Sequence, residues 1–493
     1  MNQKYIKEFK KACTDFLDAY SLTELRIYGR KVGVENPTVS QKEYLMEEIV
    51  AVLAGEKAPV VASKRGAPVK SESYDPKIDR RISELRYIYA MNLSASDFAF
   101  LATSQKKSMF AASSDIYAPK GSPHALAGDT FTGQLETVEG VSCLITLDGD
   151  YTREKVVVTL ETIENYRLRD GDVVTCRYKE FYSVCIVTEV LYINAIPWGM
   201  ETRYSFDAVP VVSPHTLISF AKSDGENKTE TKFVDWLAPI GFGQRCLIYA
   251  PPKAGKTKFA LQLAAGLAEQ KTDCERLALL IGQTPETVFQ YKQAFGEHCV
   301  VARSYEDTPE EQVAAIEFLL KRAKRFMEMS KNVVLFVDSF TEIAKAYEDF
   351  GLSEGGKRLP SGIGAETLRC LKQIFGLARA TQRFGSLTVI GTVSTRTGNP
   401  IDDDIFAGLR PLANCEIALS DEMAKRRIFP AIDLVNSFSC DGAYLFSDEK
   451  AACEYLVRNQ LLESRADEVY GALETAWNFH TFYGKMLALK DLH

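Results

Sequence analysis

The sequence has few of the residues that build metal clusters or cross-linked secreted folds. Among its 493 residues are five histidines and eleven cysteines, and no two cysteines stand in a CxxC pair. Single, scattered cysteines are typical of a reducing compartment, and they argue against a disulfide framework and against a zinc site. We therefore expect a cytoplasmic protein.

Long apolar runs are also missing. No stretch is long enough to span a bilayer, which argues against a membrane partner, and the first residues, MNQKYIK, lack the apolar core of a signal peptide. The formal net charge is −7, so any nucleic-acid binding must come from local patches. The hydrophobic fraction of 46% and the charged fraction of 25% are ordinary for globular domains, and the length allows several of them.

The most informative feature present is the segment APPKAGKT at residues 250–257, which follows the apolar run CLIY. This order predicts a strand, then a tight loop, then the start of a helix. Such an arrangement binds phosphate, because backbone N–H groups of the loop and of the first helical turn point at the anion. In such a site Lys256 can bridge the outer phosphates and the hydroxyl of Thr257 can bind Mg²⁺. Ala250 replaces the first glycine of the usual GxxxxGK[ST] pattern, so a chance GKT in a helix-capping turn is the alternative interpretation.

A second segment favours the phosphate site. Residues 333–338, VVLFVD, form a continuous apolar run that ends in Asp338. Such a run predicts a strand that is buried on both faces. Its last residue would lie at the carboxyl edge of a parallel sheet, beside the phosphate loop, where a carboxylate can hold the metal ion.

Strand and helix patterns alternate from about residue 235, which predicts a mostly parallel sheet with helices on both faces. One helix start is especially clear, since Thr308, Pro309 and Glu311 form a capping box with proline at the first helical position. The predicted strands are 244–250, 277–281, 300–302, 333–338, 387–392 and 416–420, and the predicted helices begin at residues 256, 285, 309, 340 and 365.

The part before this domain has a different pattern. Short predicted strands at 130–137, 142–147, 155–160, 173–178 and 183–193 indicate a small Greek-key barrel of the oligonucleotide/oligosaccharide-binding (OB) kind. Capping boxes at Ser21 and Ser40 predict helices near the N-terminus. The predicted regions are a helical module (1–56), a basic linker and insert (57–126), the barrel (127–197), the nucleotide-binding domain (198–440) and a C-terminal helical subdomain (441–493).

Several segments resemble those of the bacterial transcription termination factor Rho family, in the same order. The resemblance covers nearly the whole chain. It implies a multidomain α/β fold, in which a RecA-like P-loop NTPase domain is preceded by a small OB or cold-shock-like β-barrel and an N-terminal helical module. The segments are 235–241 (DWLAPIG), 250–257 (APPKAGKT), 338–341 (DSFT), 356–362 (GKRLPSG) and 427–433 (RIFPAID).

The resemblance also implies a homohexameric ring, with ATP between neighbouring subunits and RNA in the central pore. In this family Lys256, Gln283 and Asp338 would occupy catalytic positions, Thr257 and Asp338 would hold Mg²⁺, and Phe429 would stack on adenine. The implied ATP-binding residues are Pro252, Lys253, Ala254, Gly255, Lys256, Thr257, Lys258, Arg427 and Phe429.

Two residues that accelerate hydrolysis in that family are replaced here. The position of the glutamate that polarises water is Gln283, and an amide can orient a water but cannot accept its proton, a loss of roughly 10²–10⁴ in rate. The arginine finger, which can raise turnover by about 10³–10⁵-fold, falls at Cys440. No arginine or lysine lies between Arg427 and Lys450. The family's arginine after the metal-binding strand is Glu342 here.

Positions that contact RNA in the family have changed as well. The aromatic GFGF run reads GVSC at 140–143, the third-strand tyrosine falls at Val157, and a pore-loop lysine falls at Pro400. Residues 127–195 hold six basic and twelve acidic side chains, a balance that opposes phosphate binding. The remaining candidates for RNA contact are Lys357 of the first pore loop and the aromatic pair Phe181 and Tyr182, which as aromatics are more often core residues.

These patterns leave two functions open. The first is an RNA-dependent ATPase and translocase that releases transcripts. The second is a Rho-like ring protein that binds ATP without efficient turnover and acts as a regulator or scaffold. Whichever function holds, the candidate protein partners are RNA polymerase and an active Rho paralogue.

Overall fold

The computed structural model describes two compact units, one formed by residues 1–146 and 150–199 and the other by residues 147–149 and 200–493. The predicted linker and insert at 57–126 lies outside the described residues, apart from Lys57. In the part of the chain that is described, no helix is both long and apolar enough to cross a membrane. The described residues are 10–11, 13–34, 37, 41–53, 57, 130–138, 141–151, 153, 155–181, 184–200, 203–222, 227–270, 272–352, 356–382 and 384–490.

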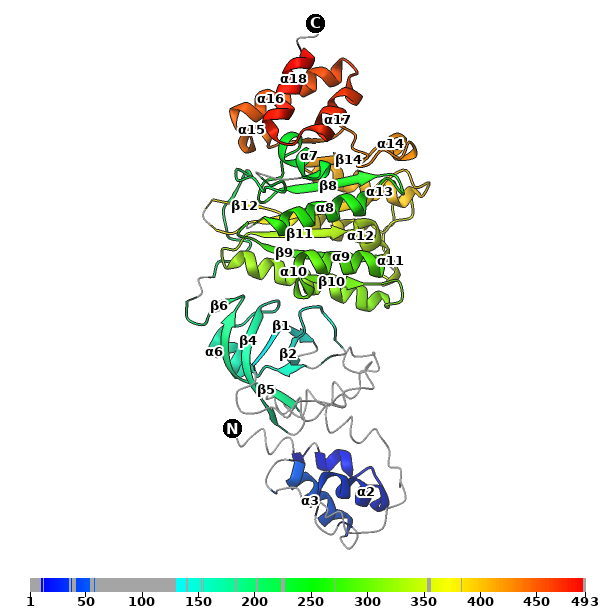
Figure 1. The fold of residues 1–493 in the computed structure, drawn as a ribbon. Helices are drawn as coiled ribbons and strands as arrows, with labels where there is room; N and C mark the ends of the chain where they lie inside the picture. Colours follow the sequence, from blue (N-terminus) through cyan, green and yellow to red (C-terminus); the bar gives the residue numbers. More distant parts are fainter. Residues whose placement is uncertain are drawn as a thin grey trace. The chain divides into compact units, whose positions relative to one another are not determined.

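Two helices near the N-terminus, α2 (Leu22–Val32) and α3 (Lys42–Leu53), share an apolar cluster that includes Leu25 and Leu45 (Figure 1). The capping box predicted at Ser21 is confirmed. Its hydroxyl accepts the N–H of Glu24, and the Glu24 carboxylate accepts the N–H of Ser21 at 3.0 Å. The second predicted capping residue, Ser40, lies outside the described residues.

Six strands close into a small barrel, because β3 pairs with both β2 and β5 in the order β3-β2-β1-β4-β5-β6. The prediction of a strand over 155–160 is wrong beyond Val157. Thr159 begins a helix there instead, since its hydroxyl accepts the N–H of Thr162 at 3.2 Å. The elements are β1 (Thr130–Val138), β2 (Val141–Ile145), β3 (Val156–Val157), α6 (Leu160–Tyr166), β4 (Val173–Phe181), β5 (Val184–Ile193) and β6 (Ile196–Pro197).

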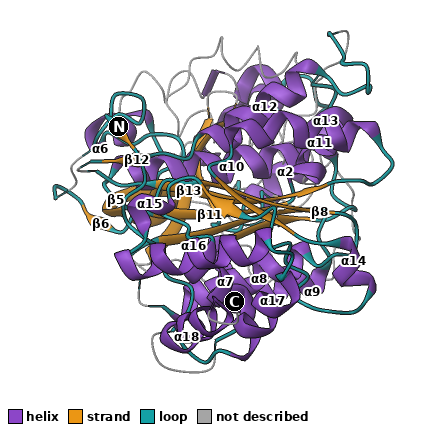
Figure 2. Ribbon diagram, turned by 90° about the horizontal axis from the view of Figure 1, so that it is seen from above, coloured by secondary structure: helices purple, strands orange, loops and turns teal. Residues whose placement is uncertain are grey.

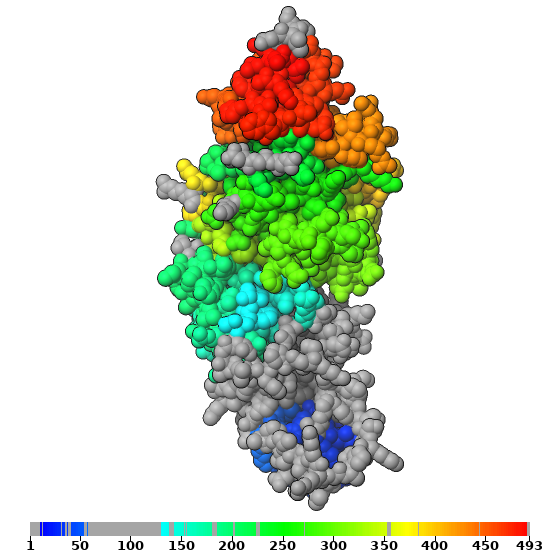
Figure 3. Space-filling view, in the orientation of Figure 1, coloured from blue at the N-terminus to red at the C-terminus, as the bar shows by residue number. Residues whose placement is uncertain are grey.

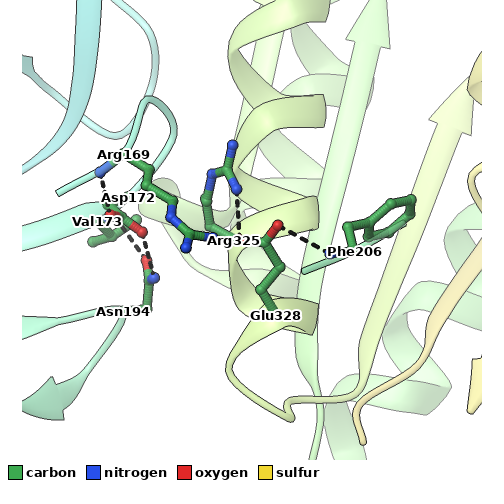
Figure 4. A network of polar contacts seen from close by, with 7 residues as sticks. All are labelled: Arg169, Asp172, Val173, Asn194, Phe206, Arg325 and Glu328. Carbon is green, nitrogen blue, oxygen red and sulfur yellow. Dashed lines mark hydrogen bonds and ion pairs between the residues drawn. The ribbon is translucent and has the colours of Figure 1, made fainter. Parts of the chain in front are cut away.

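A polar network around the fully buried side chains of Asp172 and Asn194 joins the turn before β4 to the end of β5 (Figure 4). One carboxylate oxygen of Asp172 accepts from the Asn194 amide at 2.9 Å, and the other accepts the N–H of Arg169 at 2.8 Å. The Asn194 carbonyl oxygen in turn accepts the N–H of Val173 at 2.8 Å. Buried polar groups with such partners fix a loop geometry at little cost.

The second unit is built on a seven-stranded sheet in the order β10-β9-β11-β13-β8-β14-β15. Neighbouring strands run parallel, except that β15 is antiparallel to β14. Helices cover both faces, with α8 and α9 on one and α10 to α13 on the other (Figure 2). Its main elements are α7 (Thr229–Leu237), β8 (Arg245–Ala250), α8 (Lys256–Glu269), β9 (Glu275–Ile281), α9 (Pro285–Phe295), β10 (Val300–Arg303), α10 (Pro309–Glu328), β11 (Val333–Asp338), α11 (Phe340–Asp349), α12 (Ala365–Gly376), β13 (Leu387–Ser394), α13 (Pro400–Leu409), β14 (Cys415–Ala418), α14 (Asp421–Lys425) and β15 (Phe438–Ser439).

The predicted strands and helix starts of this unit are confirmed, with ends that differ by a few residues. Every residue of β11 is buried, as its apolar run predicts. The capping box before α10 is also present, since the hydroxyl of Thr308 accepts the N–H of Glu311 and the Glu311 carboxylate accepts the N–H of Thr308 at 2.9 Å. The shorter elements are β7 (Val211–Val212), which pairs with β12 (Ala380–Thr381), and the 3₁₀ turns η1 (Glu297–Cys299) and η2 (Arg410–Leu412).

The last helices pack beside α7, and their atoms run from orange to red in the space-filling view (Figure 3). The ring of Trp236 in α7 stacks on Phe482, with 5.5 Å between ring centroids. Both side chains belong to the same apolar cluster as the interior of β8, so this region continues the core of the sheet domain. These helices are α15 (Gly442–Leu445), α16 (Asp448–Leu462), α17 (Ala466–Thr475) and α18 (Phe479–Lys490).

Candidate functional site

The loop between β8 and α8 has the shape of a phosphate-binding turn. Lys253 and Gly255 both adopt left-handed backbone angles, with φ of 65° and 96°. Gly255 caps α8 without a side-chain hydrogen bond among the described residues, so N–H groups of the first helical turn can serve an anion. A Cβ atom at Gly255 would lie 3.7 Å from the ring of Phe429, which places that ring over the loop.

The Lys256 ammonium lies against this loop. Its Nζ atom donates to the carbonyl oxygens of Ala250 at 3.1 Å and Pro251 at 3.3 Å. Burial lowers the pKa of Lys256, while the negative charges of Asp338 and Asp402 act in the opposite direction. A partly desolvated ammonium of this kind attracts a phosphate oxygen more strongly than an exposed lysine does.

Asp338 ends β11 at the carboxyl edge of the sheet and is 2% exposed. Burial raises the pKa of its carboxyl group, and the nearby hydroxyls of Thr392 and Thr257 oppose that shift. The Thr392 hydroxyl donates to Oδ1 at 2.6 Å, whereas Oδ2 has no hydrogen-bond partner among the described residues. The structure thus brings together the predicted residues Lys256, Thr257 and Asp338.

Beside the loop lies a cavity of about 240 Å³. Phe429 contributes to its wall and is 39% exposed, so its ring can be reached by a ligand. Of the predicted ATP-binding residues, Pro252, Lys256, Thr257 and Arg427 do not line the cavity. The lining residues are Glu230, Lys253, Ala254, Gly255, Lys258, Phe259, Leu419, Phe429, Pro430 and Ala431.

The other predicted site residues lie in separate places. Gln283 is half-buried in the turn between β9 and α9, and Arg427 is exposed with a φ of 62°. Lys357 is exposed in the loop before α12, where its carbonyl oxygen accepts the N–H of Ala365 at 2.9 Å. The side chain of Phe181 and all of Tyr182 lie outside the described residues.

Two acidic residues of the site were not predicted. Glu230, in the first turn of α7, is 8% exposed inside the cavity wall, and burial raises its pKa. Asp402, in α13, is 6% exposed. Its Oδ2 accepts from the hydroxyl of Thr397 at 2.6 Å, and its Oδ1 has no partner among the described residues. Neither follows a strand with a recognisable motif, so no local signal in the sequence could have identified them.

A match to a protein family covers much of the sheet domain. Residues 230–439 match the ATP synthase alpha/beta family, nucleotide-binding domain. Among solved structures, an ATPase from the type III secretion system of pathogenic bacteria aligns with a TM-score of 0.47 at 20% identity, over 62% of this chain and 94% of that one.

Curated relatives are transcription termination factors. The chain is 30% identical to transcription termination factor Rho of Pseudomonas fluorescens biotype C over 350 residues, which is 69% of this chain and 83% of that protein. It is 32% identical to Rho of Bacillus subtilis (strain 168) over 311 residues, 62% of this chain and 72% of the relative. For Rho of Escherichia coli (strain K12) the identity is 30% over 348 residues, 68% and 82% of the two chains. By its P-loop domain and these relatives, the chain belongs to the transcription termination factor Rho family.

Proposed function

We propose that this chain is an ATP-binding P-loop ATPase that works as a hexameric ring and acts on RNA in transcription termination. The observation that carries the proposal is the arrangement of Lys256, Thr257 and Asp338 at the carboxyl edge of a parallel sheet. Such an edge, next to a helix N-terminus, is where α/β domains bind nucleotide phosphates. The neighbouring cavity, with the ring of Phe429 in its wall, offers a place for the base.

The residues present also fit a magnesium ion. Mg²⁺ prefers oxygen ligands such as a carboxylate and a hydroxyl, and Asp338 presents an oxygen without a hydrogen-bond partner in the described part of the chain, beside the hydroxyl of Thr257. Those two residues would hold the ion. When bound, Mg²⁺ would neutralise charge on the outer phosphates.

RNA is the proposed polymer on which the ring acts. The support comes from the Rho relatives, from the closed barrel and from Lys357 in an exposed loop of the sheet domain. The barrel also has a half-buried aromatic pair, Phe131 and Tyr178, with ring centroids 6.3 Å apart. Partly exposed aromatic rings can stack on bases.

Gln283 and Cys440 are the residues that favour the second function, a ring that binds ATP without efficient turnover. Cys440 is exposed directly after β15, and its N–H donates to the carbonyl oxygen of Asn414 at 2.8 Å. A cysteine at this place cannot supply the positive charge of an arginine finger. In that case a regulatory or scaffolding role, with RNA polymerase or an active Rho paralogue as partner, replaces the motor.

One experiment separates the two functions. Steady-state ATP turnover of the purified full chain is measured with and without a cytidine-rich RNA, together with a nucleotide-binding titration on the same sample. Turnover that rises with RNA, and an RNA affinity that falls steeply with salt, supports the proposed motor. Tight nucleotide binding without turnover identifies the non-motor ring, and the absence of nucleotide binding contradicts both.

A further inference from the structure

The loop after β9 has no acidic residue at the position where the Rho family has its water-polarising glutamate. Gln283 follows Gly282 there, and its amide cannot accept a proton. An amide can still orient the water, but direct transfer of the water's proton to a side chain would need a carboxylate from another segment at the same place. Among the described residues, Glu342 and Asp402 are the acidic side chains whose charges act on the Lys256, Lys345 and Asp338 cluster.

Glu342 lies in α11, the helix that follows β11, and its side chain reaches the loop after the neighbouring strand β9. It lies in the first turn of α11, one turn after Asp338, and its N–H donates to the Ser339 hydroxyl at 3.2 Å. A Cβ atom built on Gly282 would lie 3.3 Å from the Oε2 atom of Glu342. The carboxylate of Glu342 therefore occupies the space directly over the backbone of the residue that precedes Gln283.

This carboxylate is ion-paired through one oxygen, and its side chain is partly exposed. Its Oε1 atom accepts from the Lys345 ammonium at 2.7 Å, and 21% of the Glu342 side chain is exposed. Oε2 is the oxygen nearest Gly282, and the ring of Tyr305 lies there too, since its Cε1 atom would be 3.0 Å from a Cβ atom at Gly282. Negative charge on Glu342 is also felt at Asp338, whose pKa it raises, although burial is the larger cause.

Asp402 fits the role less well. Its Oδ2 atom is engaged by the Thr397 hydroxyl at 2.6 Å, which closes the turn before α13. The residue is 6% exposed, so a water would have to be buried with it. Its other oxygen, Oδ1, has no hydrogen-bond partner among the described residues, and the negative charge of Asp402 acts to raise the pKa of Lys256.

We propose that Glu342 is the catalytic carboxylate of this chain, which orients the attacking water and accepts its proton in place of Gln283. The inference rests on the proposed ATPase function. The water oxygen forms the new bond to the γ-phosphorus, and the bond from that phosphorus to the β–γ bridging oxygen breaks, with its electron pair leaving on ADP. The proton of the water passes to the Glu342 carboxylate and from there to solvent, and the products are ADP and inorganic phosphate.

A purely structural role for Glu342 must be distinguished from this one. An acidic residue in the first turn of a helix stabilises the helix dipole, and an ion pair to Lys345 adds a little more. Glu311 provides a matched control, since it occupies the corresponding turn of α10 in the same domain and accepts the N–H of Thr308 at 2.9 Å. Replacing either residue by glutamine removes a negative charge from the first turn of a helix, but only Glu342→Gln should lower ATP hydrolysis.

The test uses the full chain and three variants: Glu342→Gln, Glu311→Gln and the double variant Glu342→Gln/Gln283→Glu. We expect Glu342→Gln to lower ATP turnover by about 10²–10⁴-fold, the loss that follows removal of a general base, while the Kd for ATP changes by less than about threefold. Nucleotide extracted from this variant after incubation with ATP should be ATP rather than ADP. Glu311→Gln should behave like the unmodified chain.

The double variant is the sharpest part of the test, because it returns a carboxylate to the loop after β9. Its ATP turnover should be at least about tenfold higher than that of the single variant Glu342→Gln. Turnover of Glu342→Gln at the unmodified level overturns the inference and leaves the ATPase function intact, and so does a loss of ATP affinity that accounts for the whole effect. An unmodified chain that binds ATP without turnover overturns the inference together with the motor function, whereas a chain that binds no nucleotide overturns the proposed function itself.

Discussion

Two buried aspartates, one in each compact unit, show how the same side chain can serve structure or chemistry. Asp172 in the barrel is 0% exposed, and both of its oxygens accept hydrogen bonds, from Asn194 and from the N–H of Arg169. Asp338 in the sheet domain is 2% exposed, but its Oδ2 atom has no hydrogen-bond partner among the described residues. Burying a charge without a full set of partners is costly.

The difference indicates where a ligand belongs. A carboxylate whose hydrogen bonds are complete needs nothing further, and its role is to hold the turn before β4. A buried carboxylate with an open oxygen, next to a hydroxyl and an ammonium, is a position that a cation and a phosphate would complete. The same isosteric change, aspartate to asparagine, should therefore have opposite consequences at the two positions.

The largest effect is expected for Asp338→Asn. The variant should lose ATP turnover by about 10²–10³-fold, because a preorganised charge beside the phosphates is removed. The free energy of unfolding of the ligand-free chain should stay the same or rise, since the amide does not bury a charge. Turnover assays and urea denaturation measure the two quantities, and undiminished turnover would show that Asp338 is not a binding residue.

The base side of the site should respond to Phe429→Ala. Stacking of a base on an aromatic ring contributes roughly 1–3 kcal/mol, so the Kd for ATP should increase about 5- to 150-fold. A titration with a fluorescent ATP analogue measures this, and Phe429→Tyr is the matched control because it keeps the ring. Equal affinities for all three chains would place the base outside the 240 Å³ cavity.

A gain of activity is expected from Cys440→Arg. If the ring forms, an arginine at this exposed position would reach the phosphates of ATP bound to the neighbouring subunit. It would then restore part of the roughly 10³–10⁵-fold gain in turnover that an arginine finger can supply. We expect at least about a tenfold rise in RNA-stimulated turnover, with Cys440→Ser as the unchanged control. A Cys440→Arg chain that assembles normally and hydrolyses ATP no faster would show that this position does not face the phosphates.

Local patterns in the sequence predicted most of the fold and the proximity of Lys256 and Asp338. The strands of the sheet and the caps at Ser21 and Thr308 were predictable because each depends on neighbouring residues alone. Lys256 and Asp338 were predictable because the carboxyl ends of parallel strands meet at one edge. That rule needs only the strand pattern and the phosphate loop.

Other parts depend on contacts between distant segments. The position of Glu342 over Gly282 follows from the packing of α11 beside the end of β9, which no motif encodes. Glu230 enters the cavity wall from α7, a helix that precedes the phosphate loop. In the barrel the strand pattern at 155–160 was misleading because Thr159 uses its hydroxyl to start α6, a local choice that competes with strand pairing.

The smallest effect on activity, and the clearest contrast with Asp338, is expected for Asp172→Asn. The new amide group must face either the Asn194 amide or the N–H of Arg169, so one donor meets another donor in a fully buried place. The cost should be about 1–3 kcal/mol in the stability of the barrel, seen as faster amide hydrogen exchange in peptides from residues 130–197. ATP affinity should not change, because the aspartate holds a turn rather than a ligand. Lost nucleotide binding in this variant, with normal exchange in the barrel, would reverse the roles assigned to the two aspartates.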